Sequence, residues 1–471
     1  MTGPARRSLL DQANEGAARV LSDCLSLSRG DAVAIFWDES TAACVAALTE
    51  AADELGVELI DRFLSIEEQR RASVARAISR ADQEAIDGAR AVLICVAPDT
   101  ETIAYRKALV HAAVDVSRYV GMIPGATLEV LGHAVNIDYD EVQDRCDDLA
   151  VAMLLGSEAV LTTIDASGEG RPYELRLGLG LLGRSPITST GIIESDTWGN
   201  LPGGETFIAP VEGTSNGEYL LNGSFTGHVL RDDQPLVLRF EAGQLVAVDG
   251  VGTGREAFDR LIDWPCCATH LSPLSLAELG VGVNTSIGEL TGNPLFDEKM
   301  ARTVHIAVGD NSIYGGQLHS HMHQDFVTRR PSLSIDGQPI LRDGDYVFDE
   351  AYWREDLVRV ENMGAALGGG ADERFIAKRP LQASADRKGR LAVRREVGAK
   401  RKCIYTVGNL EVSRMLARFY EVLPPPPESI SLRRLADRWQ CASGETRLHV
   451  IKGLIAVLIR HELVGVHLPE D

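Results

Sequence analysis

Three strand-length segments in the first hundred residues constrain the fold more than any other feature of the chain. They are residues 31–37 (DAVAIFW), 57–62 (VELIDR) and 91–97 (AVLICVA). Residues 41–55 and 66–86, which separate them, have the composition and spacing of helices, and residue 56 is a glycine that ends the first of these. Strands that alternate with helices through short connections predict a parallel sheet with crossover helices.

This N-terminal part is predicted to be an α/β domain over residues 1–165. A helix over residues 5–29 precedes its strands, and a helix over 139–155 and a strand over 159–165 complete it. Neither a G-x-G-x-x-G motif nor a P-loop follows any of the strands, which argues against a nucleotide site.

The sequence pattern changes from residue 168 onward, where glycines become frequent and strand-like runs become short and closely spaced. The runs are residues 173–179, 207–210, 219–222, 236–240 and 244–248. Such spacing with glycine turns favours antiparallel strands over a further βαβ unit. We therefore expect a β-rich α+β domain over residues 166–349.

Composition narrows the classes of protein. The 471 residues allow two to four domains, and the net charge of −21 argues against binding of nucleic acid or a membrane surface by the chain as a whole. The eight cysteines contain no C-x-x-C pair, and the adjacent Cys266 and Cys267 suit a reducing compartment. No secretory signal core or apolar run of about 18 residues occurs, so a cytoplasmic protein is predicted.

Residues 301–327 (ARTVHIAVGDNSIYGGQLHSHMHQDFV) hold four of the eleven histidines: His305, His319, His321 and His323. His323 and Asp325 form an H-x-D pair, whose side chains share one face of an extended segment. Imidazole and carboxylate are common ligands of zinc, manganese and non-haem iron. His305 lies in an apolar run and needs a partner if buried. A solvated histidine-rich loop with one satisfied core histidine would explain the same spacing.

Three glutamates stand near apolar strand-like segments. Glu205 follows a Gly-Gly turn in NLPGGETFIAP, Glu278 is enclosed in LAELGVGVN, and Glu298 lies in LFDEK just before the His305 run. Glu205 would serve as a ligand or base, or more ordinarily as a turn-stabilising glutamate. Glu278 requires a metal, a cation or a proton, because an isolated buried charge is costly.

These motifs in their order resemble a known superfamily. NLPGGETFIAP, AELGVGVN, LTGNPLFDEKMARTVHIAVGDN and H-x-D are similar to motifs of the thermophilic-type metallo-aminopeptidases, the leucyl aminopeptidase T and aminopeptidase S family, over residues 31–349. The resemblance implies two metals in a cleft between an α/β domain and a β-rich domain. Carried over by motif, the ligands would be Glu205, Glu278, His305, His323 and Asp325.

The chain departs from that family after His305. The family's aminopeptidases have a tyrosine seven residues later, where this chain has Ser312, and Tyr314 follows two residues on. The G-D-N after His305 resembles a divergent branch that includes the 2,5-dihydroxypyridine dioxygenases. The resemblance to that branch implies one iron held by His305, His323 and Asp325. Retention of Glu205 and Glu278 favours hydrolysis.

The C-terminal part has a different character. Three glycines at 368–370 lie in an expected linker, residues 350–377, and residues 378–471 carry 18 Lys and Arg against 10 Asp and Glu. The net charge is therefore +8 in residues 378–471 and −29 in residues 1–377. Strands at 391–395, 403–407 and 463–468 and helices at 410–423, 432–440 and 448–461 predict a small winged-helix-like domain. It is similar to peptide-recognition domains of ribosomal peptide natural-product enzymes.

Two other functions of this C-terminal domain stay open. It would bind DNA through Arg433, Arg434, Arg438 and Arg447, or act as a lid or an oligomerisation domain.

The leading hypothesis is therefore a metal-dependent, aminopeptidase-like hydrolase that acts on peptides in the maturation of a peptide natural product. Zinc, cobalt or manganese would activate water, Glu278 or Glu298 would move the proton, and Tyr314 would stabilise the oxyanion. The alternatives are an Fe(II) oxygenase, a tailoring enzyme that recruits a leader or carrier peptide, and an inactive binding protein. The expected partners are a peptide substrate and a second copy in a homodimer.

Overall fold

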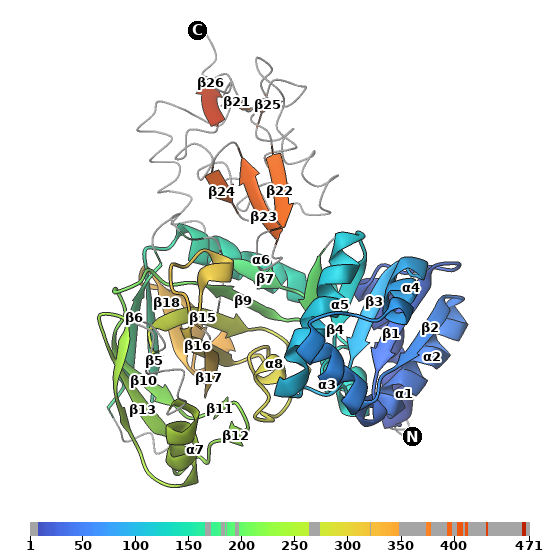
Figure 1. Cartoon of the computed structure of the whole chain (residues 1–471). Coiled ribbons are helices and arrows are strands. Elements are labelled where there is room, and N and C mark those ends of the chain that lie inside the picture. The colour runs from blue at the N-terminus through green and yellow to red at the C-terminus, as the bar shows by residue number, and fades with distance from the viewer. Residues whose placement is uncertain are drawn as a thin grey trace, which may run out of the picture.

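The structure is a computed structural model of the chain. It describes residues 8–164, 171–179, 184, 186–193, 197–262, 274–320 and 322–347. Beyond residue 347 it describes the backbone of six short strands. The described residues form an α/β part, two antiparallel sheets beside it, and these short strands (Figure 1).

The N-terminal part contains a five-stranded parallel sheet in the order β2-β1-β3-β4-β8. Helices cover both faces, since alternate residues of β1 and β3 enter two separate apolar clusters, one with α1 and α2 and the other with α4 and α5. The expected α/β fold is thus confirmed. The strands are β1 (Ala32–Trp37), β2 (Glu58–Phe63), β3 (Ala91–Cys95), β4 (Tyr119–Met122) and β8 (Trp198–Asn200). The helices are α1 (Leu9–Arg19), α2 (Ala42–Leu55), α3 (Ile66–Ala75), α4 (Arg80–Gly88), α5 (Ile103–Asp115) and α6 (Tyr139–Leu155).

The expectation of one helix over residues 66–86 is wrong. The chain leaves α3 at Arg76, which adopts a left-handed conformation with φ of +51°. Ser79 then starts α4, because its hydroxyl accepts from the Asp82 backbone N–H while the Asp82 carboxylate accepts from the Ser79 N–H. This reciprocal capping box is a strong helix start, so two helices form where periodicity alone indicates one.

The strand expected over residues 159–165 is observed as β5 (Glu158–Thr163), but it lies outside the parallel sheet. It pairs antiparallel with β6 and β18, and β8 takes the edge of the parallel sheet instead. The burial of β5 alternates along the strand, whereas β3 is buried throughout. Alternation is typical of an antiparallel sheet with one covered face.

Two antiparallel sheets form the β-rich part. One has eight strands in the order β14-β13-β10-β6-β5-β18-β19-β20, and the other has seven in the order β12-β11-β17-β16-β15-β9-β7. The remaining strands of the first are β6 (Tyr173–Gly178), β10 (Asn216–Leu221), β13 (Leu236–Glu241), β14 (Gln244–Asp249), β18 (Ser332–Ile335), β19 (Gln338–Arg342) and β20 (Asp345–Tyr346). The second contains β7 (Ile187–Ser189), β9 (Glu205–Ile208), β11 (Ser224–Phe225), β12 (His228–Val229), β15 (Leu276–Gly282), β16 (Thr303–Gly309) and β17 (His323–Arg329).

The two antiparallel sheets pack against each other through β10 and β17. The buried Tyr219 hydroxyl donates to the Phe326 carbonyl oxygen at 2.6 Å, and the Thr328 hydroxyl donates to the Leu220 carbonyl oxygen at 2.7 Å. Helix α7 (Thr253–Ile262) adds Phe258, whose ring lies 5.1 Å from that of Phe326. The β-rich fold expected from residue 166 onward is confirmed by these sheets.

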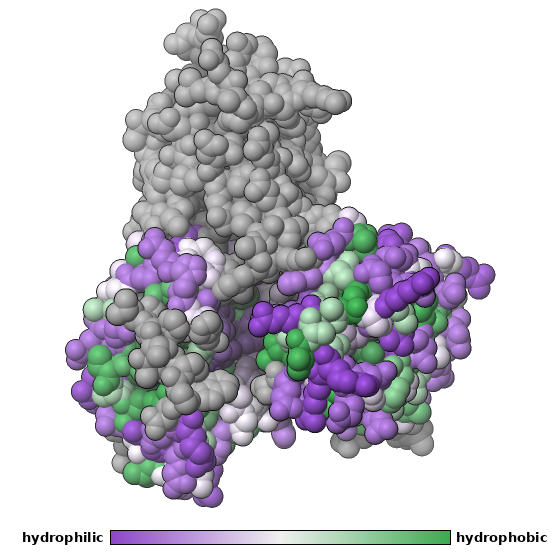
Figure 2. Space-filling model, viewed as in Figure 1, coloured by the Kyte–Doolittle hydropathy of each residue, from purple (hydrophilic) through white to green (hydrophobic). Residues whose placement is uncertain are grey.

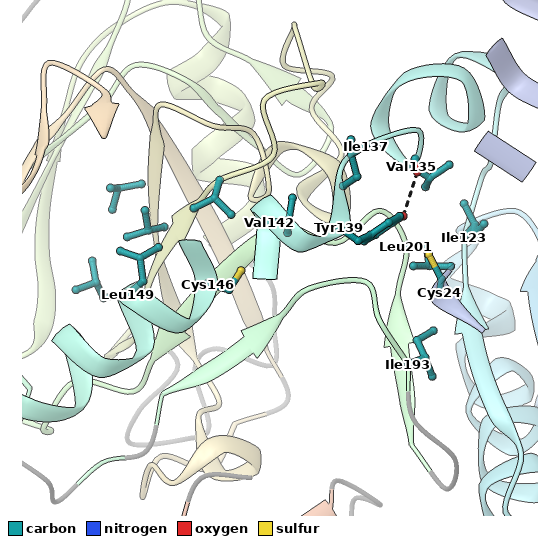
Figure 3. Close-up of a cluster of buried hydrophobic side chains, with 14 of the residues drawn as sticks. Cys24, Ile123, Val135, Ile137, Tyr139, Val142, Cys146, Leu149, Ile193 and Leu201 are labelled. Atoms are coloured by element: carbon teal, nitrogen blue, oxygen red, sulfur yellow. Dashed lines mark hydrogen bonds between the residues drawn. The ribbon is translucent and has the colours of Figure 1, made fainter. Parts of the chain in front are cut away.

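Helix α6 joins the two parts into one apolar core. A single cluster of buried side chains runs from α1 through α6 into both antiparallel sheets. Figure 3 shows the α6 part of it, including Cys146 and Leu149. The Thr206 hydroxyl donates to the Cys146 carbonyl oxygen at 2.9 Å, so α6 is anchored directly on β9. On the face drawn in Figure 2, a recess separates the α/β lobe from the β-rich lobe.

The C-terminal strands form two small sheets, β25-β21-β26 and β22-β23-β24. They are β21 (Arg374–Ala377), β22 (Val393–Val397), β23 (Cys403–Val407), β24 (Leu410–Val412), β25 (Ile430–Ser431) and β26 (Val464–His467). Strands predicted at 403–407 and near 391–395 and 463–468 are present. The first residues of the predicted helix over 410–423 instead form the strand β24, which extends the β22–β23 hairpin. The other predicted helices, the glycines at 368–370 and the arginines proposed to bind DNA lie outside the described residues.

Among the helices that the structure describes, none combines the length and the apolar character needed to cross a bilayer. Four cysteines of the described chain are buried free thiols: Cys24, Cys44, Cys95 and Cys146.

Asn284 connects the end of β15 to both parts. It is fully buried, and its side-chain amide donates to the carbonyl oxygens of Ala134 and Gly203, at 2.9 Å each. Ala134 ends a helical turn of the α/β part, and Gly203 precedes β9. This one side chain therefore fixes the junction from which the strands of the site described below project.

Asn284→Ala is expected to lower the free energy of unfolding by about 3 kcal/mol, because two buried carbonyl oxygens lose their donor at roughly 1–3 kcal/mol each. Urea unfolding followed by tryptophan fluorescence measures the loss. Asn216→Ala is the control: this exposed asparagine makes two side-chain hydrogen bonds, at 2.9 and 2.8 Å, and its removal should cost about 1 kcal/mol or less. Equal losses would contradict the role assigned to Asn284.

Candidate metal centre

Four neighbouring strands of the seven-stranded sheet carry the expected metal ligands. Glu205 begins β9, Glu278 lies in β15, His305 lies in β16, and His323 and Asp325 open β17. The register pairs Gly282 with Glu205, Gly280 with His305, Ala307 with both Glu278 and Asp325, and Gly309 with His323. Residues paired across antiparallel strands project to the same face. The five side chains therefore converge on one face of the sheet.

Small residues make room for this convergence. Gly280, Gly282, Ala307 and Gly309 alternate with the ligand candidates on the same face. At Gly280 a Cβ atom would lie 2.1 Å from Nε2 of His305. Any side chain at that position would displace the imidazole, so Gly280 is required by the functional face.

His305 lies at the centre of the cluster and is fully buried. Its Nε2 is 3.1 Å from Oε1 of Glu278 and 3.6 Å from Oε2 of Glu205. Burial alone would lower the pKa of His305, but the Glu278 hydrogen bond and the Glu205 charge raise it to about 9. Burial would raise the pKa of Glu278, yet its hydrogen bonds with His305 and His323 hold it well below its usual range. The carboxylates around His305 thus stabilise a positive charge at the centre of the cluster.

His323 presents its Nε2 to the same cluster, 3.4 Å from Oε2 of Glu278 and 3.3 Å from Oδ1 of Asp325. Its Nδ1 lies 2.8 Å from the carbonyl oxygen of Asp310. A proton held on Nδ1 by this carbonyl leaves the Nε2 lone pair available to a metal, and metal-binding histidines usually have such a partner. The Tyr314 hydroxyl lies 3.3 Å from the same Nδ1, and its ring meets the imidazole edge-on.

Lys299 links Glu205 and Glu298. Its fully buried Nζ lies 2.9 Å from Oε1 of Glu205 and also donates to Oε1 of Glu298. Burial alone would lower the pKa of Lys299, but these two charges raise it above its usual value, so the side chain is an ammonium. Burial, assisted by the Glu205 charge, raises the pKa of Glu298 to about 8. Glu298 therefore exchanges a proton near neutral pH.

Helix α8 (Pro294–Asp297) places Glu298 and Lys299 at the cluster. Asp297 is fully buried, and its carboxylate accepts from the Ser224 hydroxyl at 2.6 Å and from the backbone N–H groups of Thr291 and Gly292. Its neighbour Glu298 instead points into the site. Of the two acids in LFDEK, one therefore fastens the helix and the other belongs to the cluster.

Unpaired buried atoms test whether a metal fits. Within the described chain, Oε2 of Glu205, Nδ1 of His305 and Oδ1 of Asp325 have no hydrogen-bond partner. Two overlapping sets of ligand atoms lie within 4.8 Å of one another, Glu205 with Glu298 and His305, and Glu278 with His305 and Asp325. Carboxylate oxygens with imidazole nitrogens suit zinc, manganese or iron, so the residues fit a divalent metal.

The structure brings together all five residues predicted as ligands, along with Glu298 and Tyr314. His319 is exposed, and His321 lies outside the described residues. Two participants were not predicted: Lys299, although it stands beside Glu298 in LFDEK, and the backbone carbonyl of Asp310. No periodicity marks that lysine as buried, and a backbone contact leaves no signal in side-chain chemistry.

The buried carboxylates and imidazoles on this sheet face provide the ligand types that metal-dependent enzymes use. In agreement, residues 188–348 match the family of thermophilic metalloproteases (M29). The matched segment contains every candidate ligand. No curated protein matches the chain.

Two solved structures share the fold. The 2,5-dihydroxypyridine dioxygenase of Pseudomonas putida KT2440 superposes with a TM-score of 0.52 at 16% identity, over 74% of this chain and 99% of its own. Wild-type AmpT of Thermus thermophilus gives a TM-score of 0.51 at 18% identity, over 72% of this chain and 100% of its own. At these identities the two structures show a shared fold, and the similarity to metalloproteases rests on the match over residues 188–348.

Removal of a ligand should empty the site while the fold survives. His323→Ala and Asp325→Ala are expected to retain less than about a tenth of the wild-type zinc after dialysis, since even partners that only orient ligands contribute 10–100-fold to metal affinity. Elemental analysis gives the zinc content, and circular dichroism verifies the fold. His319→Ala is the matched control from the same loop and should keep its zinc. Equal zinc loss in all three variants would refute the ligand assignment.

Proposed function

We propose that the chain is a metal-dependent hydrolase that acts on peptides with aminopeptidase-like chemistry. One observation carries the proposal: buried oxygens of Glu205 and Asp325 lack hydrogen-bond partners among the described residues, and both lie next to imidazoles on one sheet face. The family match over residues 188–348 favours hydrolysis.

Glu278, His305, His323 and Asp325 would hold the metal, with Glu205 beside them. Zinc, cobalt or manganese held there would polarise the scissile carbonyl and would lower the pKa of a bound water toward neutral pH. The hydrogen bonds that keep Glu278 ionised suit it to the role of ligand. Asp310 would keep His323 in the orientation that exposes Nε2.

Glu298 would transfer the proton. Burial and the Glu205 charge raise the pKa of its carboxyl group to about 8, so it would take a proton from the attacking water and return it to the leaving amine near neutral pH. Lys299 holds its Oε1, which limits the carboxyl group to one orientation. Between the two glutamates predicted for this role, Glu298 is therefore preferred over Glu278.

Tyr314 would act chiefly through His323. Burial and the Glu278 charge raise the pKa of Tyr314 far above its usual value, so it stays a neutral phenol. Its hydroxyl lies 3.3 Å from both the Asp310 carbonyl oxygen and Nδ1 of His323. Donation to an oxyanion, as predicted from the sequence, would require the hydroxyl to leave the Asp310 oxygen.

Glu298→Gln is expected to lower kcat on an aminoacyl p-nitroanilide by about 10²–10⁴-fold, because glutamine cannot transfer a proton. Its zinc content should stay at the wild-type value. Glu289→Gln, an exposed glutamate that follows β15, is the control and should change neither quantity. A Glu298→Gln enzyme with undiminished kcat would eliminate the proton-transfer role.

A second function is favoured by the arrangement of His305, His323 and Asp325 on adjacent strands. Two histidines and one carboxylate are the ligand set of many non-haem iron oxygenases, and one protein of similar fold is a dioxygenase. Purification without chelator, with and without oxygen, separates the two functions. Bound zinc, cobalt or manganese with peptide cleavage under argon supports the hydrolase, whereas bound iron with turnover only in oxygen replaces it.

We also propose that residues 378–471 dock an acidic extended peptide, such as the leader of a natural-product precursor, and bring it to the metal. The support is the charge of +8 in this segment beside −29 in the rest. Deletion of 378–471 is expected to raise the KM for a long acidic peptide at least tenfold and leave that of a small aminoacyl amide unchanged. Tight, salt-sensitive binding of duplex DNA by the full chain, without peptide binding, would replace this role.

A further inference from the structure

The geometry points to a site for one divalent ion, in which the Lys299 ammonium takes the place of a second. We propose that Lys299 neutralises Glu205 and Glu298 where another metal would otherwise bind, and that the ion is held on the side of Glu278, His305 and Asp325. This inference rests on the proposed metal dependence and is independent of the reaction catalysed.

The first observation is the position of the Lys299 ammonium group. Its side chain is fully buried, and its Nζ contacts Oε1 of Glu205 and Oε1 of Glu298. A lysine whose only task was packing would direct its ammonium to solvent, because a buried charge is costly. Here the ammonium lies between two carboxylates of a potential ligand set, in the position that a bridging cation would take.

The second observation is that the two sets of ligand atoms share His305. Oε1 of Glu278 at 3.1 Å and Oε2 of Glu205 at 3.6 Å both approach the same nitrogen, Nε2. One imidazole nitrogen donates its lone pair to a single metal. His305 therefore completes either the set with Glu278 and Asp325 or the set with Glu205 and Glu298, and cannot serve both through Nε2.

The third observation decides between the two sets. On the Glu205 side, Lys299 already occupies one oxygen of each glutamate, and its positive charge repels a second cation. On the other side, the buried Oδ1 of Asp325 accepts no hydrogen bond within the described chain, and Nε2 of His323 lies 3.3 Å from this oxygen and 3.4 Å from Oε2 of Glu278. The ion is therefore assigned to Glu278, His305, Asp325 and His323, and the ammonium to Glu205 and Glu298.

The test counts metal ions in the full chain. Apo-protein is equilibrated with excess Zn²⁺ or Co²⁺, and bound metal is measured by elemental analysis and native mass spectrometry. The wild type is expected to bind one ion per chain. Lys299→Met, which keeps most of the side-chain volume without the charge, should bind two. Lys299→Arg, which keeps the charge, should bind one.

Loss of the ammonium leaves two buried acids facing each other, so Lys299→Met should also depend on metal for its fold. Its melting temperature is expected to rise with added Zn²⁺ by at least twice the rise seen for the wild type. A merely structural lysine would destabilise the variant without changing the ion count or this dependence.

Two ions in the wild type would overturn the inference. This wild-type count tests the inference even if Lys299→Met does not fold. A single ion of unchanged affinity in folded Lys299→Met would overturn it as well. Failure of the wild type to cleave peptides, with one ion bound, would sink the proposed hydrolysis and leave the ion count standing.

Discussion

The buried negative charge on one sheet face is the constraint on which the site depends. Glu205, Glu278, Glu298 and Asp325 are each at most 9% exposed, and carboxylates this deep require compensating positive charge or protons. Lys299, His305 and His323 supply part of it within the described chain. Oε2 of Glu205 and Oδ1 of Asp325 accept no hydrogen bond within the described chain, although an imidazole nitrogen lies 3.6 Å from the first and 3.3 Å from the second. A divalent cation bound as proposed would contact the Asp325 carboxylate and add to the compensation of the buried charge.

The fold concentrates these acids through strand register and through supports on either side. Adjacent antiparallel strands bring ligands that are 120 residues apart in the chain onto one face. Helix α6 holds β9 through the Thr206 hydroxyl, and Asn284 ties the end of β15 to the α/β part. Asp297 fastens α8, from which Lys299 enters. The parallel sheet carries none of the candidate ligands, so within the described chain it serves the site as a platform.

Local patterns in the sequence predicted much of this arrangement. The helix at 139–155 and the H-x-D pair at the start of β17 follow from periodicity and from alternation, which neighbouring residues determine. The break between α3 and α4 is also determined by neighbouring residues, through the capping box of Ser79 and Asp82. It was missed because the residues on both sides have helical composition. The placement of β5 was not predictable in this way, because its partner strands, β6 and β18, are set by distant pairing.

The distribution of positive groups explains why equally buried glutamates differ in protonation. Glu278 is hydrogen-bonded to two imidazoles, and its pKa falls well below the usual range. Burial, assisted by the Glu205 charge, raises the pKa of Glu298 to about 8, and the one ammonium that Glu298 shares with Glu205 only partly offsets this rise. Lys299 thus performs two tasks at once. It donates to Glu205 beside the metal side of the cluster, and it also holds Glu298, the buried acid whose raised pKa suits it to carry a proton.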